Sequence, residues 1–469
     1  MLLRELRLRE SGSLRAGTHR RHMSKRRLST LCASTSIDMA SSHDAPIPHI
    51  AIENTHSRFM LSIDLHGNLN MFDLERGASQ FANRPKGGDG DSKLFDRIND
   101  SSFLASSLDG NENKRHALVP KKYSPTFRLK ASLGALRYCC WYPPDPGMFI
   151  TGGFDQRVRI WDTNATKKLL DQYNVGFPIR CCEMPETFGS NHSLIAACGE
   201  APVVRLCDSI SGSITHTLIG HSANVFTLAW SPTQAFTLLT GGDDSTIRAW
   251  DIRKGKWFMA FDQERTLDSL SSNRRATRRI GWKRKRDREA KRNIDVPRAH
   301  SGCVTCIKFA RDGRRLFSTG QDGRLRSWQS DGGCELFVHF EHTGNGSRIL
   351  RFDVSEYDHC IAYPDRQKVK LYGSKTGRVI QVLNGHFETP LCCAFRIGTQ
   401  ELYTAGTDHQ ILAWCPEAVE KEMKEAWNEV RRQRQQACNA ESKNPFIDSL
   451  GFSTDDDNWS DDSLSGLSV

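Results

Sequence analysis

The sequence lacks any apolar run of the roughly 20 residues that a helix needs to cross a bilayer. Its first residues, MLLRELRLRE, alternate leucine with charge and have no continuous apolar stretch of the kind found in secretory signals. The acidic Glu5 and Glu10 also argue against a mitochondrial presequence. We therefore expect an intracellular protein that has no membrane contact.

Motifs of catalysis and of metal binding are also lacking. The segment GSKTG, at residues 373–377, does not have the Gly-Lys order of a phosphate-binding loop. No helical pair of metal ligands and no nucleophile elbow is present. One C-x-x-C pair, Cys303 and Cys306, has no second pair to complete a zinc site, so core packing explains it better. We expect no catalytic, cofactor-binding or metal-binding residue, and no enzyme.

The net charge of +10 is concentrated in two short segments. Residues 1–30 hold nine Arg and Lys against two Glu, and residues 274–292 hold eleven against two acids. The second segment contains Lys283, Arg284, Lys285 and Arg286 in succession. Such a block is typical of a nuclear import signal or of a patch that binds RNA or DNA, although a solvated loop would also tolerate it.

Three stretches of the sequence repeat one pattern. They read GHSANVFTLAWSPTQAFTLLTGGDDSTIRAWD over residues 220–251, AHSGCVTCIKFARDGRRLFSTGQDGRLRSWQ over 299–329, and GHFETPLCCAFRIGTQELYTAGTDHQILAWC over 385–415. In each, a His precedes an aromatic residue by nine positions, an Asp follows 13 or 14 later, and a Trp comes six after the Asp. This spacing is typical of WD repeats, each of which forms most of one four-stranded propeller blade.

The repeated polar residues have a structural explanation. A His, a Ser or Thr, an Asp and a Trp at these spacings can form one buried hydrogen-bonded network, which fixes the blade geometry once every group is satisfied. A His/Ser/Asp catalytic triad is the alternative, but three copies in one chain favour scaffolding. The expected network residues are His221, Thr240, Asp244 and Trp250, then His300, Ser318, Asp322 and Trp328, then His386, Thr404, Asp408 and Trp414.

Weaker copies bring the number of blades to seven. The copies end at residues 73, 162, 208, 251, 329, 373 and 415, which fits blades of about 40–45 residues once two insertions are set aside. In three copies His66, Ala201 or Arg366 occupies the position of the turn Asp, so these blades should depend on packing alone and be less rigid. The last copy ends after its third strand, and residues 26–34, RRLSTLCAS, should supply its outer strand.

The expected fold is an all-β, seven-bladed WD-repeat β-propeller over residues 26–415. A short basic helical segment, residues 1–25, precedes it, and a helix, residues 416–440, follows it. Residues 441–469 should form an acidic disordered tail. Polar insertions at about residues 80–122 and 262–298 are also expected to be disordered.

The fourth copy ends WDIR at residues 250–253, which resembles the WD-x-R box of propellers that are substrate receptors of cullin-4 RING ubiquitin ligases. In that family the Arg lies on the face that meets a three-propeller adaptor subunit, and a short helix before the ring inserts into the adaptor. An exposed guanidinium suits such an interface, since it can bond bidentately. By this resemblance the adaptor-binding residues are Trp250, Asp251 and Arg253 of the box and Leu2, Leu3 and Leu6 of the helix.

Several irregular segments resemble one branch of the same family. They include WYPPDPGMF, FDQRVRIWDTN, VVRLCDSISGS, GHFETPLCCAF and QELYTAGTDHQILAW, and the resemblance extends from about residue 43 to 416. It implies a nuclear, non-catalytic receptor that acts in transcription-coupled nucleotide-excision repair. The implied partners are the adaptor, cullin-4 and the RING subunit indirectly, stalled RNA polymerase II and a Cockayne syndrome group B-type translocase.

A second function remains open from the sequence. The chain could be a WD-repeat scaffold of an RNA- or chromatin-associated complex that uses the basic insertion to bind phosphates. The two hypotheses differ in whether the adaptor or a nucleic acid is the primary partner.

Overall fold

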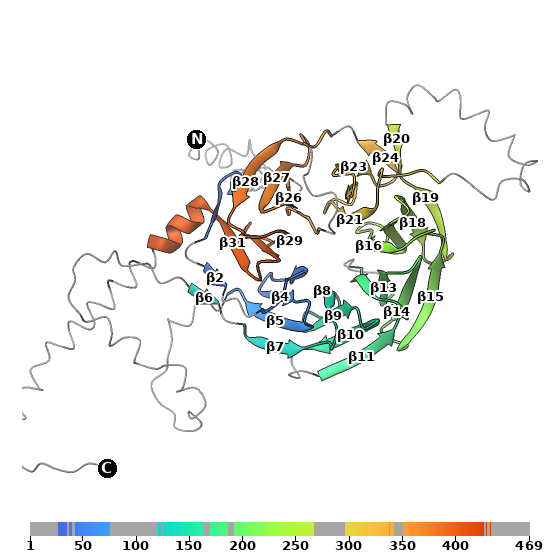
Figure 1. The fold of residues 1–469 in the computed structure, drawn as a ribbon, viewed down its shortest axis with the longest axis horizontal. Helices are drawn as coiled ribbons and strands as arrows, with labels where there is room; N and C mark the ends of the chain where they lie inside the picture. Colours follow the sequence, from blue (N-terminus) through green and yellow to red (C-terminus); the bar gives the residue numbers. More distant parts are fainter. Residues whose placement is uncertain are drawn as a thin grey trace, which may run out of the picture. The chain divides into compact units, whose positions relative to one another are not determined.

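The computed structural model describes residues 27–34, 37–39, 43–75, 121–123, 125–163, 168–185, 192–266, 296–336, 338–341, 350–357, 359–425, 428 and 432. Up to Glu420 the chain forms one compact unit, in which the described strands make a closed ring of seven blades (Figure 1). The first strand of each blade contacts the first strand of the next, and the seventh blade contacts the first in the same way. These first strands therefore enclose a central channel.

Each blade is an antiparallel sheet whose strands are ordered from the channel outwards. Blade 1 consists of β3 (His49–Ile52), β4 (Phe59–Ile63), β5 (Asn68–Asp73) and β7 (Phe127–Lys130). Blade 2 consists of β8 (Leu136–Trp141), β9 (Met148–Gly153), β10 (Arg157–Asp162) and β11 (Lys168–Asn174), and blade 3 of β12 (Ile179–Glu183), β13 (Leu194–Gly199), β14 (Val203–Asp208) and β15 (Ser213–Ile219). Blade 4 consists of β16 (Val225–Trp230), β17 (Thr237–Gly242), β18 (Ile247–Asp251) and β19 (Lys256–Ala260).

The other three blades follow the same order with two additions. Blade 5 consists of β21 (Val304–Phe309), β22 (Arg315–Gly320), β23 (Leu325–Gln329) and β24 (Cys334–Leu336), and β20 (Asp262–Thr266) pairs in parallel with its edge strand β24. Blade 6 consists of β25 (Asp353–Val354), β26 (Cys360–Asp365), β27 (Lys368–Gly373) and β28 (Val379–Asn384). Blade 7 consists of β29 (Pro390–Phe395), β30 (Leu402–Gly406), β31 (Ile411–Pro416) and β1 (Leu31–Ala33).

The blade count and spacing confirm the fold predicted from the repeats. Six of the seven third strands end at the expected residue, and the seventh, β31, runs one residue further, to Pro416. The core lies between neighbouring blades because each sheet is apolar on both faces. One cluster, for example, joins Ile150 of blade 2, Leu206 of blade 3 and Val225 of blade 4.

The seventh blade is completed by a strand from the other end of the sequence, as predicted from residues 26–34. Strand β1 pairs antiparallel with β31, so that Leu31 lies opposite Pro416 and Ala33 opposite Trp414. The side chains of Leu28 and Leu31 are each 2% exposed and pack in one cluster with Trp414. The side chain of Gln381, in β28, also donates to the carbonyl of Leu31 at 2.6 Å, which ties the strand to blade 6.

The boundaries of the expected insertions and of the helix need correction. Lys121 and Lys122 belong to β6 (Lys121–Tyr123), which pairs in parallel with β2 (Ile37–Met39) in a separate two-stranded sheet shortly before the chain enters β7. The second insertion starts later than expected, since its first residues form β20. Residues 417–425 are helical, while the N-terminal segment 1–25, the tail 441–469 and most of both insertions lie outside the described residues. Within the described part of the chain, no helix is long and apolar enough to cross a membrane.

We predict that Leu31→Ala lowers the free energy of unfolding by about 2–5 kcal/mol, the usual cost of a cavity at a fully buried leucine. The reason is that Leu31 anchors the strand that closes the ring. Urea unfolding followed by tryptophan fluorescence measures the change. Leu169→Ala, the same substitution at a side chain that is 37% exposed in β11, is the control and should have a much smaller effect. Equal losses in the two variants would contradict the role given to β1.

Candidate functional site

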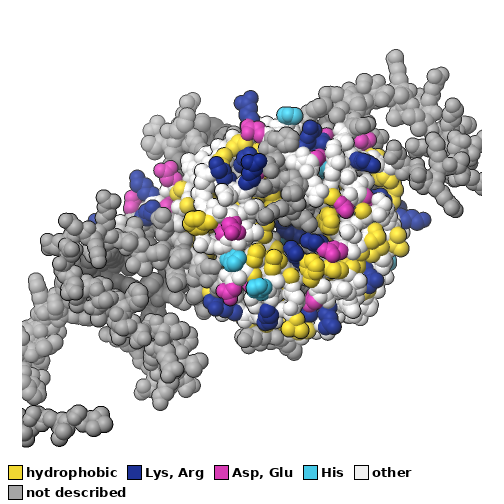
Figure 2. All heavy atoms as spheres, viewed as in Figure 1, with side chains coloured by type: hydrophobic (Ala, Val, Ile, Leu, Met, Phe, Trp, Pro, Cys, Tyr) yellow, Lys and Arg dark blue, Asp and Glu magenta, His cyan; other side chains and the backbone are white. Residues whose placement is uncertain are grey.

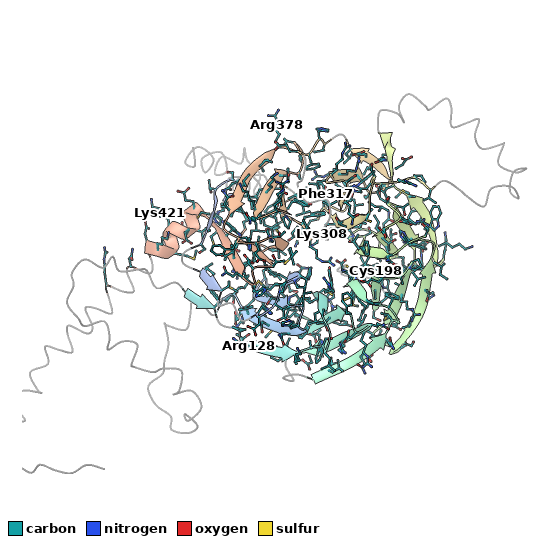
Figure 3. All side chains as sticks on the ribbon, viewed as in Figure 1. Arg128, Cys198, Lys308, Phe317, Arg378 and Lys421 are labelled. Carbon is teal, nitrogen blue, oxygen red and sulfur yellow. The ribbon has the colours of Figure 1, made fainter. Side chains whose placement is uncertain are left out.

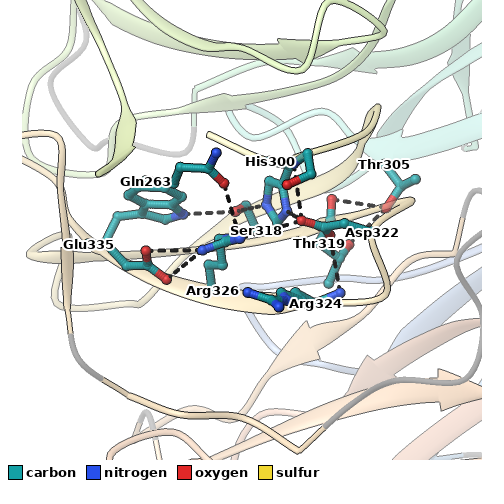
Figure 4. A network of polar contacts seen from close by, with 11 residues as sticks. Gln263, His300, Thr305, Ser318, Thr319, Asp322, Arg324, Arg326 and Glu335 are labelled. Atoms are coloured by element: carbon teal, nitrogen blue, oxygen red, sulfur yellow. Dashed lines mark hydrogen bonds and ion pairs between the residues drawn. The ribbon is translucent and has the colours of Figure 1, made fainter. Parts of the chain in front are cut away.

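Blades 4, 5 and 7 contain the predicted polar network. In blade 5, His300 Nδ1 lies 3.0 Å from Asp322 Oδ1, and His300 Nε2 lies 2.7 Å from Ser318 Oγ (Figure 4). The indole of Trp328 donates to the same hydroxyl at 2.8 Å. The equivalent contacts join the expected residues of the other two blades, namely His221, Asp244, Thr240 and Trp250 in blade 4 and His386, Asp408, Thr404 and Trp414 in blade 7.

The electrostatics of these networks follow from burial and hydrogen bonding together. Burial alone would raise the pKa of Asp244, but the hydrogen bond and the charge of His221 outweigh it and lower the pKa to about 2. Asp322 is affected in the same way by His300, and its pKa is also about 2. Burial lowers the pKa of His300 itself despite the bond to Asp322. These groups are structural, because each is enclosed within its own blade.

Blade 1 contains a variant of the network, which corrects the expectation that it depends on packing alone. His66 does occupy the position of the turn Asp, but Asp64, two residues earlier in the same turn, supplies the carboxylate. Its Oδ2 lies 3.0 Å from His43 Nδ1, and its Oδ1 accepts the backbone N–H of His66. The other ring nitrogen of His43 lies 2.6 Å from Ser62 Oγ. The side chain of Asn70 is 3.0 Å from that nitrogen.

Blade 2 has half of the network, and the residues that the structure describes in blades 3 and 6 do not form it. In blade 2, Ser132 donates to Asp155 at 2.9 Å, and Trp161 donates to Thr151 at 2.9 Å. Blade 3 has only apolar side chains at the corresponding strand positions, which is consistent with the prediction from Ala201. Arg366 in blade 6 occupies a two-residue turn and adopts a left-handed φ of 56°. Packing and other contacts must therefore hold blades 3 and 6.

The WD-x-R box places an exposed guanidinium on one face of the propeller. Arg253 lies in the turn after β18, where its Nε donates to Asp251 Oδ1 at 3.0 Å and its Nη2 to Asp251 Oδ2 at 3.1 Å. Its Cζ lies 4.9 Å from the centre of the Phe236 ring. The side chain is nevertheless 62% exposed. Trp250, by contrast, is fully buried in the blade network, so it positions the turn and does not offer a binding surface.

The ion pair fixes this arginine before any partner binds. The hydrogen bond from Arg253 holds the pKa of Asp251 below its ordinary range, and the same contact raises the pKa of Arg253. Because two N–H groups already bond to Asp251, the guanidinium has a set orientation and its outer edge faces solvent. A side chain that is already held loses less conformational entropy on binding.

The remaining predicted site residues lie outside the described residues. These are Leu2, Leu3 and Leu6 of the N-terminal segment and Lys283, Arg284, Lys285 and Arg286 of the basic insertion. Their roles stay predictions.

The central channel contains a set of charged residues that the repeat pattern did not reveal. Arg351, next to β25 in blade 6, donates through Nη2 to the carbonyl of Arg180 in blade 3 at 2.6 Å. Its Cζ lies 4.4 Å from the ring of Tyr138 in blade 2, which stacks on His49 of blade 1. Tyr138 also donates to Glu183, and burial raises the pKa of that carboxyl to about 8. The two contacts of Arg351 cross the ring between blades that are not neighbours, whereas Tyr138 joins adjacent blades.

An ion pair in the channel joins blades 5 and 6, and its carboxylate also contacts blade 7. Lys308 of β21, labelled beside the centre of the ring in Figure 3, lies 2.9 Å from Asp353 of β25. The other oxygen of Asp353 accepts the backbone N–H of Phe395 in β29 at 2.8 Å. In the space-filling view, basic and acidic side chains lie in the central opening and apolar ones surround it (Figure 2).

The arrangement favours binding over chemistry. Within the described residues, no group of His, Cys, Asp and Glu is placed to hold a metal ion. A closed ring of blades with repeated His, Ser or Thr, Asp and Trp networks defines a WD-repeat β-propeller, a class of protein that generally acts as a non-catalytic scaffold.

Comparisons with known proteins agree with this class. The family model described as "WD domain, G-beta repeat" matches residues 124–162, 212–251 and 291–329. WD repeat-containing protein ATCSA-1 of Arabidopsis thaliana is 30% identical over 465 residues, which cover 88% of this chain and 95% of the relative. Radiation-sensitive protein 28 of Saccharomyces cerevisiae is 25% identical over 40% of this chain and 37% of its own length. The chain therefore belongs to the WD-repeat family that includes ATCSA-1.

We predict that Asp64→Asn destabilises the protein by about 1–3 kcal/mol, because the amide does not replace the charged acceptor of buried His43. Urea unfolding of the variant beside the wild type measures the loss. Asp44→Asn is the matched control, since Asp44 is exposed and directly follows His43 in the sequence. If both variants unfold like the wild type, Asp64 does not replace the missing turn Asp.

The two depressed carboxyl pKa values also predict a dependence on pH. Asp244 and Asp322 ionise in the folded state at a pKa of about 2, below their ordinary value of 3.8. Their contribution to stability is complete above about pH 4 and is lost as the pH falls towards about 2. Unfolding free energies measured over this range should decrease with acid, and less steeply in the Asp244→Asn, Asp322→Asn double variant. An identical slope in both proteins would contradict the assignment.

Proposed function

We propose that this protein is a substrate receptor of a cullin-4 RING ubiquitin ligase, of the type found in the Cockayne syndrome group A protein. In this role it acts in the nucleus, in transcription-coupled nucleotide-excision repair at stalled RNA polymerase II. It carries no catalytic residue of its own. The observation on which the proposal rests is the guanidinium of Arg253, which is exposed and held in place by Asp251.

The register of the blades supports a specific role for Arg253. In blades 3, 4, 5 and 6 the two residues that follow the third strand lie in the turn to the fourth strand, on the same face as the first-to-second strand turns. The residue two positions beyond the end of this strand is Arg in blade 4, whereas it is Glu75 in blade 1, Ile210 in blade 3 and Asp331 in blade 5. An exposed arginine at this register position, oriented by Asp251, suits a carboxylate or carbonyl of an adaptor subunit.

The relatives support the link to repair. Similarity to ATCSA-1 extends over nearly the whole of both chains, including the segment that contains the box, and the name of the yeast relative refers to radiation sensitivity. These observations motivate the expected partners, namely a three-propeller adaptor and, through it, cullin-4 and its RING subunit. A Cockayne syndrome group B-type translocase and stalled RNA polymerase II are the expected clients.

The proposed mechanism is one of placement. One face of the propeller binds the adaptor while another binds the substrate, whose lysines then lie near a ubiquitin-loaded enzyme held by the same scaffold. The gain arises from effective concentration, so that no residue of this chain needs to touch the reacting thioester.

We predict that Arg253→Glu weakens adaptor binding by at least about tenfold. The substitution replaces a positively charged hydrogen-bond donor with a carboxylate, which repels an acceptor oxygen of the adaptor. Co-purification and surface plasmon resonance with the purified three-propeller adaptor measure the effect. The thermal midpoint of the variant should stay within a few degrees of the wild type, since the side chain is mostly exposed.

Lys375→Glu is the matched control. Lys375 stands two residues beyond the end of β27, the register position of Arg253, and its side chain is exposed in blade 6. It undergoes the same reversal of charge on the same face. Adaptor affinity should be unchanged in this variant. Adaptor binding that survives Arg253→Glu, or that Lys375→Glu removes equally, would contradict the proposed docking residue.

A further inference from the structure

Two arginines lie together at the end of the channel opposite to the Arg253 face. Arg137 is the second residue of β8 and Arg180 the second residue of β12, and these two strands are neighbours around the channel. Both strands begin beside the turns that join second and third strands, since Leu136 pairs with Gly153 and Ile179 with Gly199. In blade 4 the WD-x-R box follows the other end of the sheet, where Thr237 pairs with Asp251.

Both guanidinium groups pack on the ring of Phe154. The Cζ of Arg137 lies 4.9 Å and that of Arg180 5.5 Å from the centre of the Phe154 ring. Arg180 also lies 5.9 Å from the centre of Phe226 in blade 4. All four side chains are half-buried, so the pair of arginines is part of a formed surface and not a flexible fringe.

The positive charge of this cluster exceeds the negative charge that faces it. Glu200 pairs with Arg180 at 2.5 Å and is also the one negative charge among the described residues that acts on Arg137, against the positive charges of Arg180 and Arg351. Burial and then the charge of Arg180 lower the pKa of Arg137. The Nε atoms of Arg137 and Arg180 are buried and have no hydrogen-bond partner in the described part of the chain. A ligand does not reach these buried atoms, but two like-charged guanidinium groups with one facing carboxylate favour an anion at their accessible edges.

An exposed apolar side chain borders the same cluster. Leu133 is 98% exposed, in the segment that leads into β8. The backbone N–H of Phe154 donates to the carbonyl of Ala135 at 2.9 Å, so this segment is bound to the turn that carries Phe154. A leucine so fully exposed beside a basic cluster offers an apolar contact next to the anion site.

We infer that the Arg137–Arg180 cluster, together with Leu133, binds an acidic segment of a partner protein in which carboxylate side chains alternate with apolar ones. The carboxylate bonds to the guanidinium groups, and its apolar neighbour packs on Leu133. A nucleic acid suits the site less well, because single-stranded binding relies on aromatic rings that stack on bases, whereas Phe154 and Phe226 lie beneath arginines. The inference does not depend on the ligase proposal, since the site lies at the other end of the blades.

A labelled peptide tests this site in the full-length protein. A short fluorescein-labelled peptide of alternating Asp and Leu should bind the wild type in fluorescence polarisation, and the same peptide with Asn in place of Asp should not. Arg137→Gln should weaken binding at least about tenfold, the loss expected for a charge-assisted hydrogen bond. Leu133→Gln should also weaken binding, and its exposed position leaves folding unaffected.

Arg128→Gln is the control, since Arg128 is an exposed arginine of β7 and Figure 3 places it at the outer rim of the ring. It should bind the peptide like the wild type. Thermal melting checks that Arg137→Gln and Leu133→Gln are folded. The inference is overturned if both folded variants bind the peptide with full affinity. It is also overturned if the wild type binds the Asn peptide as well as the Asp peptide. Displacement of the peptide by polyuridine at equal affinity would show a nucleic-acid site instead. None of these results depends on adaptor binding.

Discussion

The side chain of Arg351 crosses the central channel from blade 6 to blades 2 and 3. It is 8% exposed, and its charge is met by a backbone carbonyl and by the face of an aromatic ring. Blades 3 and 6 are the two blades whose described residues form neither the His–Asp network nor the Ser132–Asp155 variant of blade 2. The ring therefore has two kinds of internal support: a polar network within blades 1, 2, 4, 5 and 7, and a charged contact between the two that have none.

Closure of the ring gives this contact its importance. A propeller is stable only if every blade packs against both neighbours, so one loose blade exposes two apolar interfaces. Blade 7 is secured by β1, which joins distant parts of the sequence, and blade 6 is bound to that strand through Gln381. With the ring closed, the two ends of the blades form separate faces. Arg253 lies on one, and the Arg137–Arg180 cluster lies at the other, so a partner on one face leaves the other free.

The sequence predicted the repeated parts of this structure well, because each blade reuses the same local rules. The spacing from His to Trp located three complete networks, the ends of the third strands and the source of the closing strand. The resemblance of the WDIR segment to a known box drew attention to Arg253, whose side chain is exposed in the structure and whose role in binding stays a prediction. The error at blade 1 arose because a strict register assigned the turn position to His66, whereas the fold needs only a carboxylate within reach of His43, and Asp64 provides it.

The charged residues of the channel could not be predicted in the same way. Arg351 acts on Tyr138 and Arg180, which are far away in sequence, and no spacing rule connects side chains that meet across a ring. The sequence holds only an indirect indication of these channel residues. Arg137 and Arg180 each directly follow the apolar residue that begins an inner strand, and Arg351 directly follows Leu350, just before the inner strand β25. An arginine at a position that faces the channel in three blades indicates a function for the channel and not for the core.

Hydrogen exchange of the Arg351→Met variant tests the account of the ring most directly. The substitution keeps a long side chain but removes the charge that bonds to Arg180, so blades 3 and 6 should lose protection together although they lie on opposite sides of the channel. Mass spectrometry of peptides from β12–β15 and β25–β28 should show faster exchange, while peptides from β16–β19 in blade 4 keep their rates. Unchanged exchange in both blades, or loss confined to blade 6, would contradict the claim that Arg351 holds the ring across its centre.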